Sequence, residues 1–177
     1  ALELTGASVQ SVPGGEIYQA LASGAIDGAE WIGPYADERL GFQEICKFYY
    51  TGGFHEPGSV LTASFNRDIY DSLTPAQQSV MFNAAAAASM HESVGATANN
   101  AAALERIIAQ GVKPMAFPDD VWDLFGEASA KAMDAYMDDD LYAEIRGSYN
   151  ASVSQSTKWL DMADRLFVQQ RSRVLGV

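Results

Sequence analysis

The sequence predicts an α/β fold that contains one unusually long helix. Two short apolar runs, 9–12 and 25–31, flank a segment with helical spacing, and the order strand, helix, strand is typical of an α/β unit. After Thr74, apolar residues recur every three or four positions for about 36 residues, which indicates a continuous helix. An apolar strand-like run over 112–117 follows that helix directly.

The first part of the chain reads as short elements separated by breakers. Pro13-Gly14-Gly15 ends the first predicted strand, and a helix over 16–22 is followed by Gly24 as its natural stop. Gly33-Pro34 ends the second predicted strand at 31. We then expect a helix near 37–44, a strand near 45–50, a glycine-rich loop, and another strand over 59–64.

The long helix has clear start and stop signals. Thr74-Pro75-Ala76-Gln77 forms a capping box with proline at the first helical position, and Gly111 is the expected end. Such a helix would be ~54 Å long. Because a compact lobe is smaller, we expect it to run along two lobes or to reach a partner subunit. Further helices are predicted after Pro118 and over 151–174.

Composition narrows the class of protein. The chain has 177 residues, with 23 acidic against 11 basic side chains and a net charge of −12. An acidic surface repels the phosphate backbone, so nucleic acid is not an expected partner. No apolar run reaches the ~18 residues of a membrane span. The start at Ala1 lacks the features of a signal peptide, as a mature or truncated start also would.

The residues that could perform catalysis form no convincing set. His91-Glu92 lacks the second histidine of a zinc helix, because position 95 is Gly95. Cys46 and His55 could form a nucleophile pair, yet Cys46 lies in an apolar run where a thiol is usually inert. Asp138-Asp139-Asp140 lacks the spacing of a calcium loop and is expected to be a solvated helix end.

Two carboxylates stand out because of their neighbours. Glu30 and Trp31 end the predicted strand 25–31, and ligands of open α/β sheets bind just outside such strand ends. Glu56 lies in the glycine-rich loop. An isolated glutamate at such a place is most often a solvated surface group. Here, however, aromatic and imidazole side chains accompany both acids, namely Trp31, Tyr35, Phe54 and His55.

Two longer motifs resemble the solute receptors of tripartite ATP-independent periplasmic (TRAP) transporters. The first covers 13–21 and 24–34, and the second comprises Lys47-Phe48-Tyr49-Tyr50 followed by Phe54-His55-Glu56-Pro57-Gly58. The second is similar to the branch that binds 2-oxo acids or lactate. The resemblance runs from about Ser8 to the end of the chain. It implies a two-lobed periplasmic-binding-protein-like fold, of which this chain is the carboxy-terminal part, with the long helix spanning the lobes.

The resemblance also implies a site. Glu30 and Glu56 would give carboxylate oxygens and Trp31 its main-chain carbonyl to a sodium or calcium ion, with Trp31, Tyr35, Phe54 and His55 lining the pocket for a small organic acid such as pyruvate or lactate. Hard cations prefer such oxygen ligands. The arginine that clamps the acid in this family precedes the start of this chain, and Arg39 does not follow its pattern.

The implied organisation divides the chain into an α/β portion over 1–73, which contributes to the ligand cleft, and a mainly helical portion over 74–177. The amino-terminal lobe would be absent. The resemblance implies a periplasmic location for this protein. Its expected partners are the membrane permease subunits of the transporter and a second copy of the chain, paired through a long helix. Two alternatives stay open: a helical interaction module without ligand, and an enzyme using His55 and Glu56 as acid and base.

Overall fold

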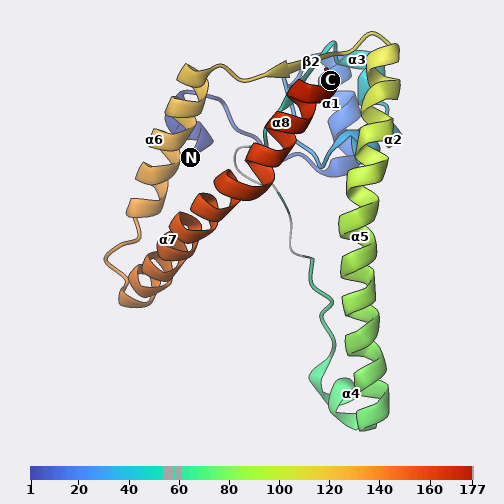
Figure 1. Ribbon diagram of the computed structural model, residues 1–177, viewed down its shortest axis with the longest axis vertical. Helices are drawn as coiled ribbons and strands as arrows, with labels where there is room; N and C mark the ends of the chain where they lie inside the picture. The colour runs from blue at the N-terminus through green and yellow to red at the C-terminus, as the bar shows by residue number, and fades with distance from the viewer. Residues whose placement is uncertain (54–57, 59–60, 177) are drawn as a thin grey trace. The chain divides into compact units, whose positions relative to one another are not determined.

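The computed structural model describes residues 1–53, 58 and 61–176 (Figure 1). The chain divides into two compact units. The larger unit is Ser8–Trp122, and the smaller one combines Ala1–Ala7 with Asp123–Val177. Each unit is described by itself below.

The larger unit contains short elements, one long helix and two strands. In chain order they are a 3-10 turn at Gly14–Glu16, α1 (Ile17–Ser23), α2 (Pro34–Arg39), α3 (Phe42–Ile45), β1 (Phe48–Thr51), α4 (Arg67–Ser72), α5 (Pro75–Ala109) and β2 (Lys113–Ala116). The first turn of α6 closes the unit.

The two strands form a parallel pair. Phe48 lies opposite Lys113 and Thr51 opposite Ala116. A parallel pair requires a long crossover, and here the crossover contains α4 and α5. The aromatic ring of Tyr50 stacks on Phe117 with centroids 4.8 Å apart, which extends the packing just past β2.

The long helix α5 confirms the predicted capping box and its predicted length. It spans 35 residues, Thr74 accepts a hydrogen bond from the amide of Gln77, and the Gln77 side chain accepts one from the amide of Thr74 (Figure 1, green). Gly111 adopts a positive φ of 96°, a conformation that favours glycine, and the chain enters β2 two residues later.

The buried core of the larger unit is small and lies around the carboxy-terminal part of α5. α2 packs against this helix. The buried apolar residues described there are Ile17, Ala103, Ile107 and Val112. The buried charged residue in the same region is Asp37, which is 7% exposed.

Several predicted strands are wrong. Residues 9–12 and 25–31 are irregular, and so are the described residues 61–64 of the predicted strand 59–64. An extended run becomes a strand only when a neighbour takes its backbone hydrogen bonds, and the sheet recorded among the described residues has two strands, β1 and β2. The predicted helix 37–44 is divided at Gly41, which has a positive φ of 77°.

The smaller unit is helical. Its elements are a 3-10 turn at Leu2–Thr5, the remainder of α6 (Asp119–Asp134), α7 (Asp140–Leu160), a π-helical segment at Asp161–Arg165 and α8 (Leu166–Leu175). The predicted last helix therefore begins earlier than position 151. Asp139 caps it, because its side chain accepts a hydrogen bond of 2.9 Å from the amide of Tyr142. The acidic run 138–140, predicted to be a solvated helix end, is thus exposed and lies at the amino-terminal end of α7.

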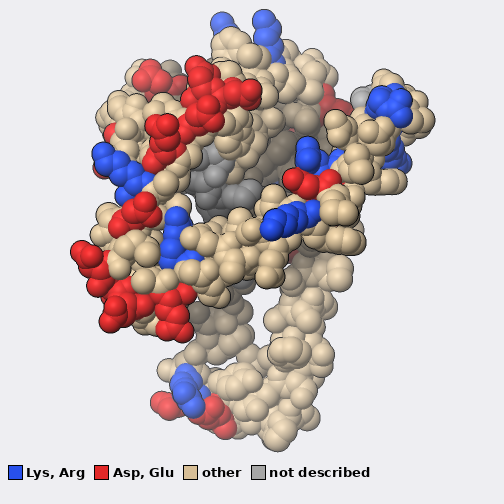
Figure 2. Space-filling view, turned by 60° about the vertical axis from the view of Figure 1, so that its left-hand side comes forward, with Lys and Arg blue, Asp and Glu red and all other residues tan. Residues whose placement is uncertain are grey.

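Charged side chains are unevenly distributed over the surface. Figure 2 shows acidic patches with basic side chains between them. The lower part of that view, where α4 and the amino-terminal part of α5 lie, is largely uncharged apart from its tip. No helix in the described part of the chain has the length and apolar character that crossing a bilayer requires.

Candidate functional site: an anchored loop at Glu30 and Trp31

Glu30 and Trp31 lie in the irregular segment between α1 and α2, at the start of a tight loop that we call loop 30–33. Glu30 is exposed and Trp31 is half-buried. The Trp31 ring lies directly over Gly14, where a Cβ would come within 2.5 Å of its Cη2 atom. The glycine of the Pro-Gly-Gly motif thus makes the space in which this indole lies.

The carboxylate of Asp37 anchors the loop. Its Oδ1 atom accepts hydrogen bonds from the amides of Ile32 at 3.3 Å and Gly33 at 3.1 Å. Its Oδ2 atom accepts a 2.6 Å hydrogen bond from the hydroxyl of Tyr49 in β1. A buried carboxylate is costly without partners, and these three donors satisfy it. α2 and β1 therefore both fix the backbone that follows Trp31.

The long helix holds the other side of the loop. The Asn100 Oδ1 atom of α5 accepts a 3.0 Å hydrogen bond from the amide of Tyr35, and the same side chain lies against Gly33. The guanidinium carbon of Arg39 lies 4.7 Å from the centre of the Tyr35 ring, a cation–π contact. Arg39 thus contacts a residue of its own helix, α2.

An ion pair attaches α2 to α5 one turn further along. The Arg106 guanidinium donates two hydrogen bonds to the Glu38 carboxylate, at 2.8 Å and 2.5 Å. These hydrogen bonds lower the pKa of the Glu38 carboxyl below its ordinary value. Asn100 and Arg106 therefore attach both ends of α2 to one helix.

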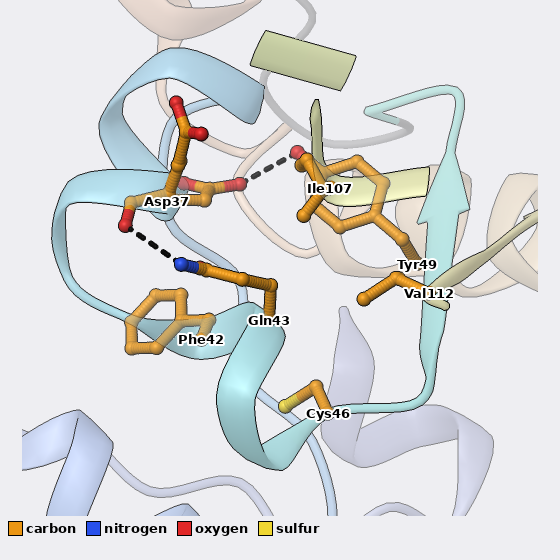
Figure 3. A pocket seen from close by; sticks show the side chains of 8 residues that line it. Asp37, Phe42, Gln43, Cys46, Tyr49, Ile107 and Val112 are labelled. Atoms are coloured by element: carbon orange, nitrogen blue, oxygen red, sulfur yellow. Dashed lines mark hydrogen bonds between the residues drawn. The ribbon is translucent and has the colours of Figure 1, made fainter. Parts of the chain in front are cut away.

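A small, mostly apolar pocket lies beneath this assembly (Figure 3). Its lining residues come from α2, α3 and the residue that follows it, β1, α5 and the residue before β2, and they are Asp37, Glu38, Phe42, Gln43, Cys46, Tyr49, Ile107 and Val112. Burial raises the pKa of the Cys46 thiol, so this cysteine stays protonated and weakly nucleophilic. That placement supports the interpretation of the half-buried Cys46 as an inert thiol.

The structure places three of the six predicted site residues. Glu30 and Trp31 share loop 30–33, and Tyr35 lies in the first turn of α2. The prediction that Glu30 and Trp31 end a strand is wrong, because residues 25–31 are irregular. Phe54, His55 and Glu56 lie outside the described residues.

Sequence reasoning missed the residues that hold the loop: Gly14, Asp37, Tyr49 and Asn100. A signal for Asp37 was present. An acid shortly after a helix start can reach back to the amide of the N-cap residue, as in a capping box. Gly33 is the N-cap of α2 and Pro34 its first helical residue, so the Asp37 carboxylate performs this function one position later than the usual motif.

The donor chemistry at loop 30–33 fits a hard cation. A glutamate carboxylate and a main-chain carbonyl are oxygen ligands of the kind that sodium and calcium prefer. Within the part of the chain that the structure describes, no three acidic, histidine or cysteine side chains gather into a metal site. Glu30 and Trp31 would therefore supply part of a coordination shell.

The sequence matches a family model and a curated relative. The model of bacterial extracellular solute-binding protein, family 7, matches residues 1–140. A monocarboxylate 2-oxoacid-binding periplasmic protein from Nostoc sp. is 37% identical over 134 residues, which cover 71% of this chain and 37% of that protein. The chain thus spans little more than a third of the curated relative that it matches.

Solved structures of TRAP transporter solute-binding proteins are similar to most of the chain. A Bordetella bronchiseptica protein, a mixed-occupancy dimer with copurified calcium and picolinate, is 31% identical with a TM-score of 0.87 over 94% of this chain and 50% of that one. A Colwellia psychrerythraea protein with bound calcium and pyruvate is 30% identical with a TM-score of 0.83 over 93% of this chain and 51% of that one.

A Pseudoalteromonas atlantica protein with bound sodium and pyruvate is 29% identical, with a TM-score of 0.78 over 92% of this chain and 50% of that one. These likenesses confirm the predicted α/β solute-binding-protein fold. They also favour a binding protein over the alternative of an acid–base enzyme that uses His55 and Glu56. The chain belongs to the family 7 bacterial extracellular solute-binding proteins, the receptors of TRAP transporters.

Proposed function

We propose that this chain is the carboxy-terminal part of a periplasmic receptor that captures a small 2-oxo or 2-hydroxy monocarboxylate together with sodium or calcium. The receptor delivers the acid to the membrane permease subunits of a TRAP transporter. The observation that carries the proposal is the way in which hydrogen bonds fix the backbone of loop 30–33. Glu30 and Trp31 offer two hard oxygen ligands on a backbone that Asp37 and Asn100 fix from two sides.

Electrostatics explain why a cation belongs in the site. The chain carries a net charge of −12, so an anionic acid approaches an unfavourable potential. A cation between the Glu30 carboxylate and the carboxylate of the acid replaces that repulsion with two attractions. Glu56 is the second proposed carboxylate ligand, while Tyr35, Phe54 and His55 are proposed to line the pocket with Trp31.

The proposed site is completed by residues beyond this chain. A guanidinium is the best partner for a carboxylate, because it donates two parallel hydrogen bonds. Arg39 contacts Tyr35 and Arg106 pairs with Glu38, so both have partners in the described structure. We assign the clamping arginine to the amino-terminal lobe, and residues 1–73 and 74–177 of this chain to the cleft portion and the mainly helical portion.

Exposed apolar surface supports a larger assembly. On α5, Val80 is 68% exposed, Phe82 76% and Met90 67%. On α8, Phe167 is 63% exposed. Apolar surface of this extent usually contacts another part of the protein or a partner. We propose that the amino-terminal lobe and a second receptor copy cover these helices. Measurement of the molar mass of the full-length protein checks the second copy, and we expect the mass of a dimer.

Thermal unfolding of the full-length receptor tests the function. Pyruvate and lactate are each added with sodium, with calcium, and with potassium as the control cation after chelation of divalent ions. Ligand bound to the native state raises stability by RT ln(1 + [L]/Kd), about 4 kcal/mol at 1,000 Kd. We expect a large rise in Tm only when acid and the correct cation are present together. A Tm that no acid–cation pair changes would contradict the proposal.

A further inference from the structure

The pattern of bonds at Asp37 determines more than the position of the loop. The Ile32 amide that donates to Asp37 belongs to the same peptide unit as the Trp31 carbonyl. A peptide unit is planar, and no cis peptide bond occurs among the described residues. In a trans peptide the N–H and C=O groups point in opposite directions. The bond that holds the Ile32 amide against Asp37 therefore directs the Trp31 carbonyl oxygen away from Asp37.

The same bond changes the electron density of that carbonyl. An anionic acceptor on the N–H end polarises the peptide unit and increases the negative charge on its oxygen. The polarisation is effective here because Asp37 is only 7% exposed, and a low local dielectric strengthens charge–dipole interactions. A more negative carbonyl oxygen binds a cation more strongly. Hydrogen-bonding partners behind metal ligands commonly orient them and tune their basicity in this way.

Tyr49 fixes the orientation of the Asp37 carboxylate. Its hydroxyl donates to Oδ2 at 2.6 Å, which leaves Oδ1 facing the amides of Ile32 and Gly33. Burial and the hydrogen bond to Asp37 both raise the pKa of Tyr49, so the hydroxyl stays a donor at physiological pH. Pairing of β1 with β2 places Tyr49 opposite Pro114 and so fixes the backbone position from which the Tyr49 side chain reaches Asp37. Figure 3 shows the Asp37–Tyr49 bond.

We infer that Asp37, held by Tyr49, is a positioning residue for the cation: it directs and polarises the Trp31 carbonyl that binds the ion. This inference rests on the proposed function. It also links the two sequence motifs, because Tyr49 of the second motif supports, through Asp37, the Trp31 carbonyl of the first. Neither side chain touches the cation or the acid in this account.

Calcium and sodium titration calorimetry tests the inference on the full-length receptor with pyruvate in excess. The two variants are Asp37→Asn, which keeps the shape but removes the negative charge, and Tyr49→Phe, which keeps the ring but removes the donor. For Asp37→Asn we expect the cation Kd to rise about 10- to 100-fold, as for other hydrogen-bonding partners of metal ligands. For Tyr49→Phe, one bond further away, we expect a rise of about threefold or more.

Arg106→Gln is the matched control. Like Asp37→Asn, it removes one charge that helps to hold α2, but the partner of Arg106 is the Glu38 side chain, whereas Asp37 bonds to loop 30–33. We expect this variant to keep the wild-type cation Kd. The Tm of each variant without ligand separates structural from positioning roles. A purely structural role for Asp37 would lower that Tm and leave the cation Kd of the folded protein unchanged, since the Kd is measured well below the temperature at which the variant unfolds.

The outcomes separate this inference from the function on which it rests. A wild-type receptor that binds calcium or sodium with pyruvate, and an Asp37→Asn variant with the same cation Kd, would overturn the inference and leave the function intact. A wild-type receptor that binds neither cation would overturn the function and the inference together. If Asp37→Asn does not fold, Tyr49→Phe decides, and an unchanged Kd in that folded variant would overturn the inference.

Discussion

The two halves of α5 differ sharply, although they belong to one continuous helix. The carboxy-terminal part contains Ala103 and Ile107, which are buried, and Asn100 and Arg106, which bond to α2. In the amino-terminal part, Asn83 donates to the carbonyl of Ser79 in the same helix, and Gln78 donates to the carbonyl of Tyr70 in the neighbouring α4. Its large apolar side chains are mostly exposed.

This difference shows that helix formation and burial are separate properties of the sequence. A capping box, alanine and the absence of internal proline form the helix along its whole length. Packing additionally requires a partner surface, which α2 supplies to the carboxy-terminal part through its contacts with Asn100 and Arg106. The amino-terminal half is therefore a preformed apolar surface, and the part of the helix that carries tertiary contacts is the part that fixes loop 30–33.

The largest expected effect is in the packed half. Ile107 is 3% exposed, so Ile107→Ala should destabilise the full-length protein by about 2–5 kcal/mol through lost burial and a residual cavity. Ile108→Ala is the control on the next residue, which is 43% exposed and should cost about 0.5 kcal/mol or less. Urea unfolding measures both. Equal losses in the two variants would show that the packed end of α5 does not lie where the structure has it.

Two neighbouring glycines, Gly14 and Gly15, test the position of Trp31 in loop 30–33. A Cβ on Gly14 would lie 2.5 Å from the Trp31 ring, whereas one on Gly15 would meet nothing within 4 Å. Gly14→Ala should displace the indole, cost about 1–3 kcal/mol and weaken acid binding. Gly15→Ala should leave binding unchanged. Pyruvate titration of both variants with the cation present checks this, and equal affinities would contradict the assigned position of Trp31.

The smallest expected effect is the pH dependence of the pair between α2 and α5. Arg106 lowers the pKa of Glu38 below its ordinary 4.5 in the folded protein. As the pH falls, the Glu38 carboxylate therefore becomes protonated in the unfolded chain before it does so in the folded one. The stabilisation is complete above pH 4.5 and is lost as pH falls through the lowered folded-state pKa. The difference in urea midpoint between wild type and Arg106→Gln should therefore be constant near neutrality and shrink in acid. A difference in midpoint that persists unchanged in acid would contradict the assignment of this stabilisation to the Arg106–Glu38 pair.

Local signals predicted some elements well because those elements depend on neighbours in sequence. Thr74 and Gln77 define the start of α5, Gly111 follows its end, and Pro118 precedes α6. The prediction of a strand over 25–31 was wrong because apolar character alone cannot supply a neighbouring strand that takes the backbone hydrogen bonds. The two motifs identified the family, and the ligand residues that they imply stay a prediction. Asp37 had a local signal in its spacing from Gly33, whereas the contact of Asn100 with α2 could not be predicted from spacing. Asn100 lies 65 positions from Tyr35, and only the fold brings them together.

The most direct test of the account is the cation affinity of two carboxylate variants of the full-length receptor. Glu30→Gln removes the proposed ligand, and Asp27→Asn removes another exposed acid three positions earlier. Calcium and sodium are titrated with pyruvate in excess. We expect Glu30→Gln to lose at least about tenfold in cation affinity, the order of effect seen for groups around metal sites, while Asp27→Asn binds as wild type does. A Glu30→Gln variant with wild-type affinity would contradict the assignment of the cation to loop 30–33.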